Sequence, residues 1–356
     1  MSEHPYRRQP DQAFWSRSVS ADFDPVTAFA PSTPLIRLDD RVVSIGSCFA
    51  SNLVPWLERS GVEYVRTEQP HPTFAALGEN LGYRNFSASY GNVYTSRQMR
   101  QLAERVTGRF VPTEDRWRGP GVVIDPFRPG LRHPASDDRE FAMQTERHLD
   151  ATRRAFDAAT VIVVTLGLTE MWSSRLDGAV FPAAPGTIAG TFDSERHVLH
   201  NLTADEVVDD LHAFASILRE TNPDVRFIVT VSPVPLVATA TTDHVVIASI
   251  RSKAVLRVAA ERFVEADSAS AYFPSFEIIT GPQAPHDFFE ADRRSVSAVG
   301  VSAVMRTLLA GLLDDGVTPL LPAAGESPGD QNSEETVQQL SHRLVTAECD
   351  EVLAES

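Results

Sequence analysis

Two side chains of nucleophile type, Ser47 and Cys48, follow an apolar run that ends in a glycine, Arg41 to Gly46. A glycine that closes a strand permits a tight turn, so both residues are expected near the start of the next helix. Free N–H groups at a helix start favour negative charge and can lower a thiol pKa from about 8.5 to roughly 3.5–7.5. Alternatively, Ser47 caps the helix and Cys48 is a small buried hydrophobe.

Three further polar segments are expected near the same edge of a sheet. The runs Val161 to Leu166 and Phe227 to Val231 are unbroken and rich in β-branched residues, which is typical of strands buried on both faces. In open parallel sheets, ligands bind at the carboxyl ends of the strands. The segments that should converge with Ser47 are Gly167-Leu168-Thr169-Glu170, Ser232-Pro233-Val234-Pro235 and Tyr272 to Glu277.

A serine nucleophile requires a base within hydrogen-bond reach, and His244 is the strongest candidate among the ten histidines. It follows the turn at Ser232 and begins a helical pattern, although it could simply cap that helix. His286 and His71 are weaker candidates. Five others are expected to be solvated in loops or on helix faces: His133, His148, His197, His200 and His212.

Carboxylates and cations could complete such a site. Glu170, Glu277 and Asp292 could each orient a base, as the third member of a catalytic triad does. Lys253 is the only lysine of the chain, and it could serve as a point charge or as an amine with a tunable pKa. Arg293 and Arg294 could grip a carboxylate or phosphate, or could form surface salt bridges instead.

The elements that must position these residues alternate along the chain. Helical patterns over Arg139 to Ala158, Ala204 to Glu220 and His244 to Glu265 separate the strand-like runs. This alternation predicts an α/β fold with a mostly parallel sheet, as a single domain over 31–315. Residues 1–30 are expected to form an irregular N-terminal arm, and 316–356 a linker and acidic tail.

The composition excludes several classes of protein. The 356 residues carry a net charge of −16, which disfavours a general attraction to nucleic acid. Only two cysteines occur, Cys48 and Cys349, so a disulfide framework and a cysteine-built zinc site are not expected. No apolar stretch is long enough to span a membrane, and no secretory signal is evident, which favours a cytoplasmic protein.

Five motifs together resemble the GSCFA family, over about residues 40 to 310. They are Gly46-Ser47-Cys48-Phe49-Ala50, Tyr90-Gly91-Asn92-Val93-Tyr94-Thr95, Thr165-Leu166-Gly167-Leu168-Thr169-Glu170, Thr230-Val231-Ser232-Pro233-Val234-Pro235-Leu236 and Tyr272-Phe273-Pro274-Ser275. This family is similar to the SGNH (GDSL-type) hydrolases. The resemblance implies a three-layer α/β/α sandwich of SGNH or flavodoxin-like type that cleaves or transfers ester-linked acyl groups.

The resemblance also implies roles for individual residues. Cys48 stands where the hydrolases have their nucleophilic serine, while Gly91, Asn92 and Thr169 stand at or beside oxyanion-hole positions. The hydrolases end on Asp-x-x-His, whose histidine is the base. Here the matching stretch is Asp292-Arg293-Arg294-Ser295, which lacks that histidine.

Two functions of different class follow from these patterns. In the first, Cys48 or Ser47 forms a covalent acyl-enzyme on an ester or thioester, with His244 as base and Glu170 or Asp292 orienting it. The substrate would be a small molecule or glycan, the donor an acyl-CoA or a carrier protein, and no metal or redox cofactor is implied. In the second, a non-catalytic protein uses the same crevice to bind a glycan or acylated ligand.

Overall fold

The centre of the protein is a five-stranded sheet in which every pair of neighbours is parallel. The computed structural model describes residues 4–20, 23–69, 83, 85–131 and 133–313. The strand order is β10-β9-β5-β1-β2. Read from the β2 edge, with the five strands numbered along the chain, it is 2-1-3-4-5. This order is that of a flavodoxin-like doubly wound sheet. The strands are β1 (Arg41–Gly46), β2 (Glu63–Tyr64), β5 (Val161–Leu166), β9 (Arg226–Val231) and β10 (Ser270–Phe273).

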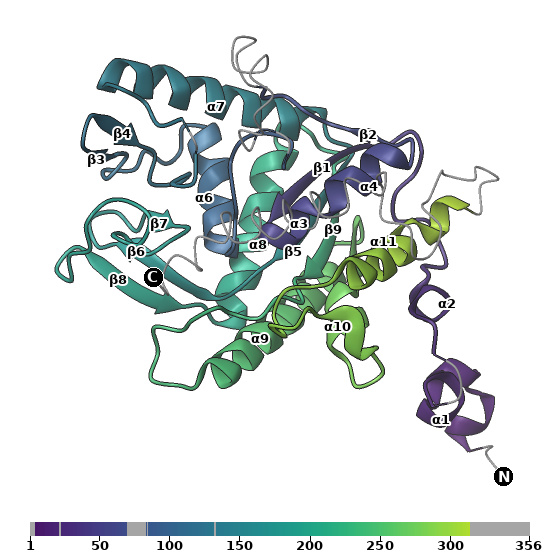
Figure 1. Cartoon of the computed structure of the whole chain (residues 1–356). Coiled ribbons are helices and arrows are strands. Elements are labelled where there is room, and N and C mark those ends of the chain that lie inside the picture. Colours follow the sequence, from purple (N-terminus) through teal and green to yellow (C-terminus); the bar gives the residue numbers. More distant parts are fainter. Residues whose placement is uncertain (1–3, 21–22, 70–82, 84, 132, 314–356) are drawn as a thin grey trace, which may run out of the picture.

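Helices cover both faces of this sheet (Figure 1). One face packs against α6 (Ser96–Val106), α7 (Asp138–Ala158), α8 (Ala204–Arg219) and α9 (Val245–Ala266). The other packs against α3 (Cys48–Ser51), α4 (Leu53–Arg59), α10 (Ser275–Thr280) and α11 (Ala298–Leu313). The predicted single-domain, three-layer α/β/α sandwich is therefore confirmed.

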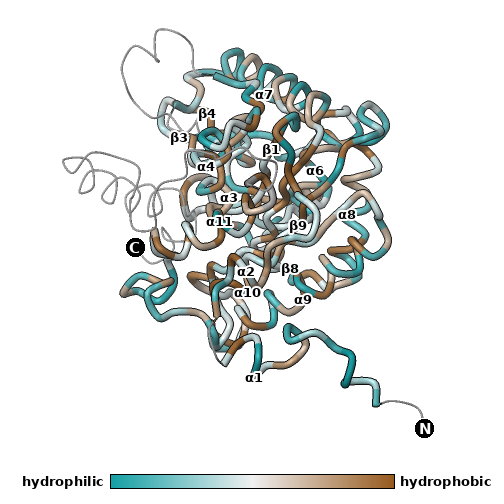
Figure 2. Tube along the Cα trace, turned by 90° about the vertical axis from the view of Figure 1, so that its right-hand side faces the viewer, coloured by the Kyte–Doolittle hydropathy of each residue, from teal (hydrophilic) through white to brown (hydrophobic). Residues whose placement is uncertain are grey.

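The central strand β5 is apolar at every position except Thr165, and the two cores explain this pattern. Ile162, Val164 and Leu166 belong to the core on one face, whereas Val161 and Val163 belong to the core on the other. Successive side chains of a strand point to opposite faces, so a strand covered on both sides is a nearly continuous apolar run. In Figure 2 the hydrophobic segments accordingly gather around β1 and β9 in the interior of the molecule.

Two small antiparallel sheets lie beside the sandwich and were not predicted (Figure 1). One pairs β3 (Trp117–Gly119) with β4 (Val122–Ile124), and the other has the order β7-β6-β8. The latter comprises β6 (Glu170–Ser174), β7 (Val180–Phe181) and β8 (His197–Asn201). Strands of two to five residues carry too little alternation to be recognised from sequence.

The N-terminal residues form short helices rather than a wholly irregular arm. They are η1 (Pro5–Arg8), η2 (Asp11–Ala13), α1 (Trp15–Ser18) and α2 (Pro25–Phe29), and α2 packs against α11. The predicted linker and acidic tail, 316–356, lie outside the described residues. In the part of the chain that the structure describes, no helix combines the length and hydropathy that crossing a bilayer would require.

Candidate functional site

Most of the predicted segments meet in one crevice at the carboxyl end of the sheet. The strand order reverses between β1 and β5, and in doubly wound sheets ligands bind at that switch point. Three of the four predicted segments line a small pocket there, together with Tyr94 and Arg294. Their lining residues are Ser47 and Cys48, Gly167 and Leu168, and Ser232 with Val234, Pro235 and Leu236. The fourth segment, Tyr272 to Glu277, contributes no lining residue.

Ser47 and Cys48 stand side by side in this pocket with different exposure. Cys48 is the first residue of α3 and is partly exposed. Ser47 is only 3% exposed, and its Oγ has no hydrogen-bond partner among the described residues. The side chain of Ser47 does not cap α3, so the predicted structural alternative is not what the fold uses. A buried hydroxyl without a partner is costly, and a group bound in the crevice would relieve that cost.

Close backbone packing brings the crevice segments together. Tyr94 O accepts hydrogen bonds from the amides of Gly167 and Leu168, both at 3.0 Å, and Gly46 O accepts from Val93 N at 2.8 Å. A Cβ at position 167 would lie 2.9 Å from Tyr94 O and 3.1 Å from the Cβ of Ser47. Only glycine at 167 therefore lets the end of β5 pack this closely against Ser47.

Lys253 supports the crevice from beneath rather than lining it. It is 4% exposed on α9, and its Nζ donates to Gly167 O at 2.6 Å. A buried ammonium needs such acceptors, because burial without them costs several kcal/mol. The only lysine of the chain thus holds the backbone of the crevice segment at Gly167. Its role in substrate binding stays a prediction.

Thr169 and Glu170 are engaged away from the crevice. Thr169 Oγ1 lies 2.6 Å from Asn201 Oδ1, and Thr169 N donates to Ser252 Oγ. Glu170 accepts from Thr239 Oγ1 at 2.6 Å and so holds the loop that follows β9. The oxyanion and orienting roles that the sequence suggested for these two residues have no supporting contact here.

The block that resembles Asp-x-x-His is built around a turn. Asp292 Oδ1 accepts from the amides of Arg294 and Ser295, both at 2.9 Å, and Oδ2 accepts from Ser295 Oγ at 2.6 Å. Partial burial alone would raise the pKa of Asp292, but these hydrogen bonds outweigh it and lower the pKa. Arg293 is exposed with a φ of 56°, whereas Arg294 lines the crevice. Arginine therefore enters the pocket from the block in which the hydrolases carry histidine.

Replacing Arg294 with glutamine is expected to slow alkylation of Cys48 several-fold at neutral pH. A nearby fixed cation stabilises the thiolate, which is the species that reacts with iodoacetamide. The rate would be measured by intact mass in a Cys349→Ser background, which leaves one thiol. Arg293→Gln is the matched control, because it removes the same charge from an exposed neighbour. Equal alkylation rates in Arg294→Gln and Arg293→Gln would contradict the role of Arg294 in stabilising the Cys48 thiolate.

No histidine is among the residues that line the crevice. His244 is exposed and caps α9, with its Nδ1 accepting from Val246 N at 3.2 Å. His286 is exposed in η3 (His286–Phe288), and His71 lies outside the described residues. A base role for His244 therefore remains a prediction.

Two histidines that were expected to be solvated are buried instead. His148 is 1% exposed, and its Nδ1 lies 2.8 Å from Glu68 Oε2. His197 is 3% exposed and lies 3.3 Å from Glu114 Oε2. The spacing of α7 could have placed His148 inside, because it lies seven residues after the buried Phe141 and seven before the buried Ala155.

Glu68→Gln is expected to lower the free energy of unfolding at pH 7 by about 3 kcal/mol. Burial alone would raise the pKa of Glu68, but the bond to His148, the charge of Arg128 and the Ser89 amide lower it to about 2. Because the folded-state pKa is depressed, this stability is present above about pH 5 and is lost as the pH falls towards 2. Urea unfolding at several pH values would measure it. Glu146→Gln is the control, because Glu146 is exposed on α7, the helix that carries His148. An unchanged acid limb in Glu68→Gln would contradict the prediction.

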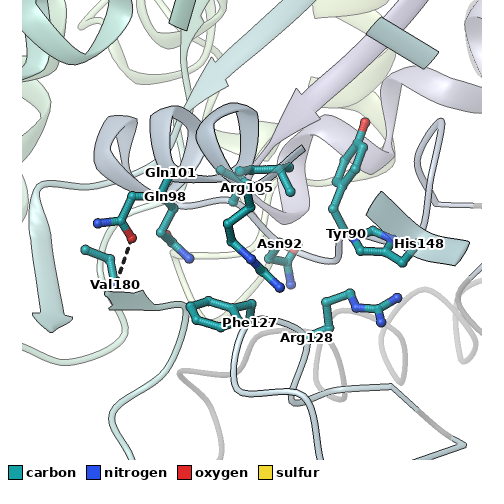
Figure 3. Close-up of a pocket in the computed structure, with 11 residues that line it drawn as sticks. Tyr90, Asn92, Gln98, Gln101, Arg105, Phe127, Arg128, His148 and Val180 are labelled. Carbon is teal, nitrogen blue, oxygen red and sulfur yellow. Dashed lines mark hydrogen bonds between the residues drawn. The ribbon is translucent and has the colours of Figure 1, made fainter. Parts of the chain in front are cut away.

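Gly91 and Asn92 precede the crevice-lining Tyr94. Gly91 has a φ of 68°, in the region that favours glycine. Asn92 lines a second pocket, shown in Figure 3, and not the crevice. The oxyanion role that the resemblance gives these two residues stays a prediction.

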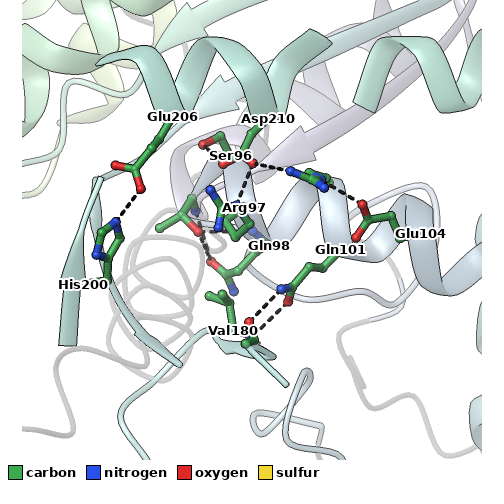
Figure 4. A network of polar contacts seen from close by, with 12 residues as sticks. Ser96, Arg97, Gln98, Gln101, Glu104, Val180, His200, Glu206 and Asp210 are labelled. Carbon is green, nitrogen blue, oxygen red and sulfur yellow. Dashed lines mark hydrogen bonds and ion pairs between the residues drawn. The ribbon is translucent and has the colours of Figure 1, made fainter. Parts of the chain in front are cut away.

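A polar network fixes the helix that begins just after Tyr94 (Figure 4). The fully buried Asp210 of α8 accepts from Ser96 Oγ at 3.0 Å and from Arg97 Nε at 2.6 Å. Thr95 caps α6 in a capping box with Gln98. The start of α6, and with it one wall of the crevice, is therefore tied to α8.

A model of the GSCFA family matches residues 41–308, which is most of the chain. The chain belongs to the GSCFA family. This confirms the resemblance drawn from the five motifs. Among the described residues of this GSCFA protein, no group of three or more His, Cys, Asp or Glu side chains could hold a metal ion.

Two solved structures are similar to parts of this GSCFA chain. One is the salicylyl-acyltransferase SsfX3 from a tetracycline biosynthetic pathway, with 16% identity and a TM-score of 0.26, covering 48% of this chain and 42% of that one. The other is the acetyl xylan esterase Est2A from the rumen bacterium Butyrivibrio proteoclasticus, with 12% identity and a TM-score of 0.30, covering 80% and 65%. The likeness thus spans less than two thirds of either structure's own length. No curated protein matches the chain.

Proposed function

We propose that this GSCFA protein acts on an acyl ester or thioester as a hydrolase or acyltransferase, through a covalent acyl-enzyme on Cys48. The observation that carries the proposal is the pairing of a partly exposed thiol with a buried hydroxyl that has no partner among the described residues, in one crevice at the switch point of the sheet. The thiol supplies a nucleophile, and the hydroxyl supplies a donor for developing charge.

The proposed reaction has two steps. In the first, the Cys48 thiolate attacks the acyl carbon, an S–C bond forms, and the donor leaves as a thiolate, or as an alcohol once protonated. In the second, water or an acceptor hydroxyl loses its proton to a base and attacks the acyl carbon, and the Cys48 thiolate is released. Arg294 would stabilise the thiolate in both the free and the released state.

A thiolate nucleophile reduces the need for the missing histidine. A serine hydroxyl must lose its proton during attack and therefore needs a base, whereas a preformed thiolate does not. We therefore favour Cys48 over Ser47 as the nucleophile. His244, in the loop beyond the Ser232 segment, remains the proposed base for the second step.

The lack of a histidine among the crevice-lining residues favours one second candidate, a non-catalytic protein that binds a glycan or acylated ligand there. Intact mass after incubation with acyl-CoA thioesters and activated esters distinguishes the two functions. If the protein is the proposed enzyme, we expect an acyl adduct that is absent in Cys48→Ala. An adduct lost only in Ser47→Ala would move the nucleophile to Ser47, and no adduct in any variant would favour the binding protein.

A further inference from the structure

A second pocket lies next to the crevice, on the other side of residues 92–94. Asn92 and Val93 line this second pocket, whereas Tyr94 lines the crevice. Figure 3 shows that its polar side chains come from α6, from the segments around residues 90 and 128, and from His148 of α7. No aspartate or glutamate is among its lining residues, which include two arginines and two glutamines. The pocket wall is therefore rich in hydrogen-bond donors and free of carboxylates.

Arg105 is the cation of this pocket whose donors are not used by the fold. Its guanidinium carbon lies 4.0 Å from the centroid of the Phe127 ring, a stacking contact that holds the group in place. Within the described part of the chain its guanidinium makes no hydrogen bond or ion pair, and Asp125 and Asp115 act on it only electrostatically. Burial lowers the pKa of Arg105, although a guanidinium remains charged at neutral pH.

The neighbouring charges are already satisfied by one another. Arg128 Nε donates to Asp125 Oδ2 at 2.8 Å, and Asp125 Oδ1 accepts from Phe127 N at 2.9 Å. Glu68 accepts from Ser89 N at 2.8 Å and pairs with His148. Asp125 and Glu68 thus use their hydrogen bonds on Arg128, His148 and backbone amides. Asp125 interacts with Arg105 only electrostatically, so the guanidinium donors of Arg105 are left for a ligand.

A second donor faces the same space. Gln98 Oε1 accepts from the amides of Tyr94 and Thr95, both at 3.0 Å, which fixes the orientation of the amide group. Its Nε2 is thereby directed away from the helix start and towards the pocket (Figure 3). A planar fork and an amide N–H around one cavity match the oxygens of a carboxylate or phosphate.

We propose that this pocket binds an oxyanion, the carboxylate or phosphate group of a ligand, through the guanidinium of Arg105 and the Nε2 of Gln98. The site is separate from the covalent chemistry at Cys48, so this proposal can be tested independently of the proposed function. Phosphate and carboxylate share this recognition chemistry, and the two probes below distinguish them.

Isothermal titration calorimetry of the full chain with sodium phosphate and sodium acetate tests the site, with ionic strength held constant by sodium chloride. We expect saturable binding of at least one probe, and the tighter of the two identifies the group. Arg105→Gln should weaken binding at least about tenfold, because a charge-assisted bidentate contact is lost. Arg109→Gln removes the same charge from an exposed ion pair with Glu220 just beyond α6, and should bind as the wild type does.

Two further variants keep the proposal open to refutation. If Arg105→Gln does not fold by circular dichroism, Arg105→Lys retains the charge without the fork and should still weaken binding several-fold. Cys48→Ala should bind the probe as tightly as the wild type, which separates this site from the nucleophile. Absence of saturable binding, or equal binding by the wild type and the folded Arg105 variant, would overturn the proposal.

Discussion

Cys48→Ala is expected to lower acyl turnover by about 10⁴-fold or more, because removing a covalent nucleophile leaves only the contributions of binding and charge stabilisation. Ser47→Ala is expected to cost about 10²-fold, the effect of losing one donor to the developing oxyanion. The difference follows from their environments: Cys48 is partly exposed in the crevice, whereas Ser47 is 3% exposed beside it.

Turnover of an activated thioester, measured for both variants and the wild type, checks this order. Cys349→Ser is the matched control, since it removes the other thiol of the chain and should leave turnover unchanged. Circular dichroism would establish that each variant is folded. Full activity in Cys48→Ala would rule out the thiol as nucleophile.

Gly46→Ala is expected to lower the free energy of unfolding by about 3 kcal/mol or more. Gly46 has a φ of 154°, and an added Cβ would lie 2.4 Å from Thr165 O and 2.7 Å from the Cβ of Thr165. Gly46 and Thr165 are paired across β1 and β5, so the two strands would have to separate next to Ser47. Loss of activity should accompany the loss of stability.

Gly108→Ala is the control for this substitution. Gly108 also has a positive φ, 72°, but an added Cβ would meet no atom within 4 Å. It should therefore cost only about 1 kcal/mol of backbone strain. Urea unfolding of both variants measures the two effects, and equal midpoints would show that β1 and β5 tolerate the extra methyl group.

The long elements could be predicted nearly to the residue. β1 and β5 have the predicted bounds, and β9 begins one residue earlier, at Arg226. The predicted helix over Arg139 to Ala158 is α7, which begins at Asp138. Strands buried on both faces and helices of four or more turns have hydrophobic patterns that are long enough to be recognised in the sequence.

Two departures from these patterns were not predictable from the sequence. The helix expected to start near Ser47 and Cys48 is two short helices, α3 and α4, which meet at Asn52. His148, which the sequence predicts to be solvated, pairs with Glu68, which lies eighty residues away in the chain. A contact of that range depends on which helix covers which face, and local sequence carries no such information.

The family, the α/β class and three of the segments that line the crevice could be predicted from the amino-acid sequence, because each depends on local patterns and on the rule that strand ends gather at one edge. Which side chains reach the crevice became known only from the folded structure. It showed that Arg294 lines it, that Lys253 supports Gly167 from below, and that Thr169 turns to Asn201. It also revealed the pocket around Arg105. These outcomes depend on packing between elements distant in the chain, where burial and hydrogen bonding decide the direction of each side chain.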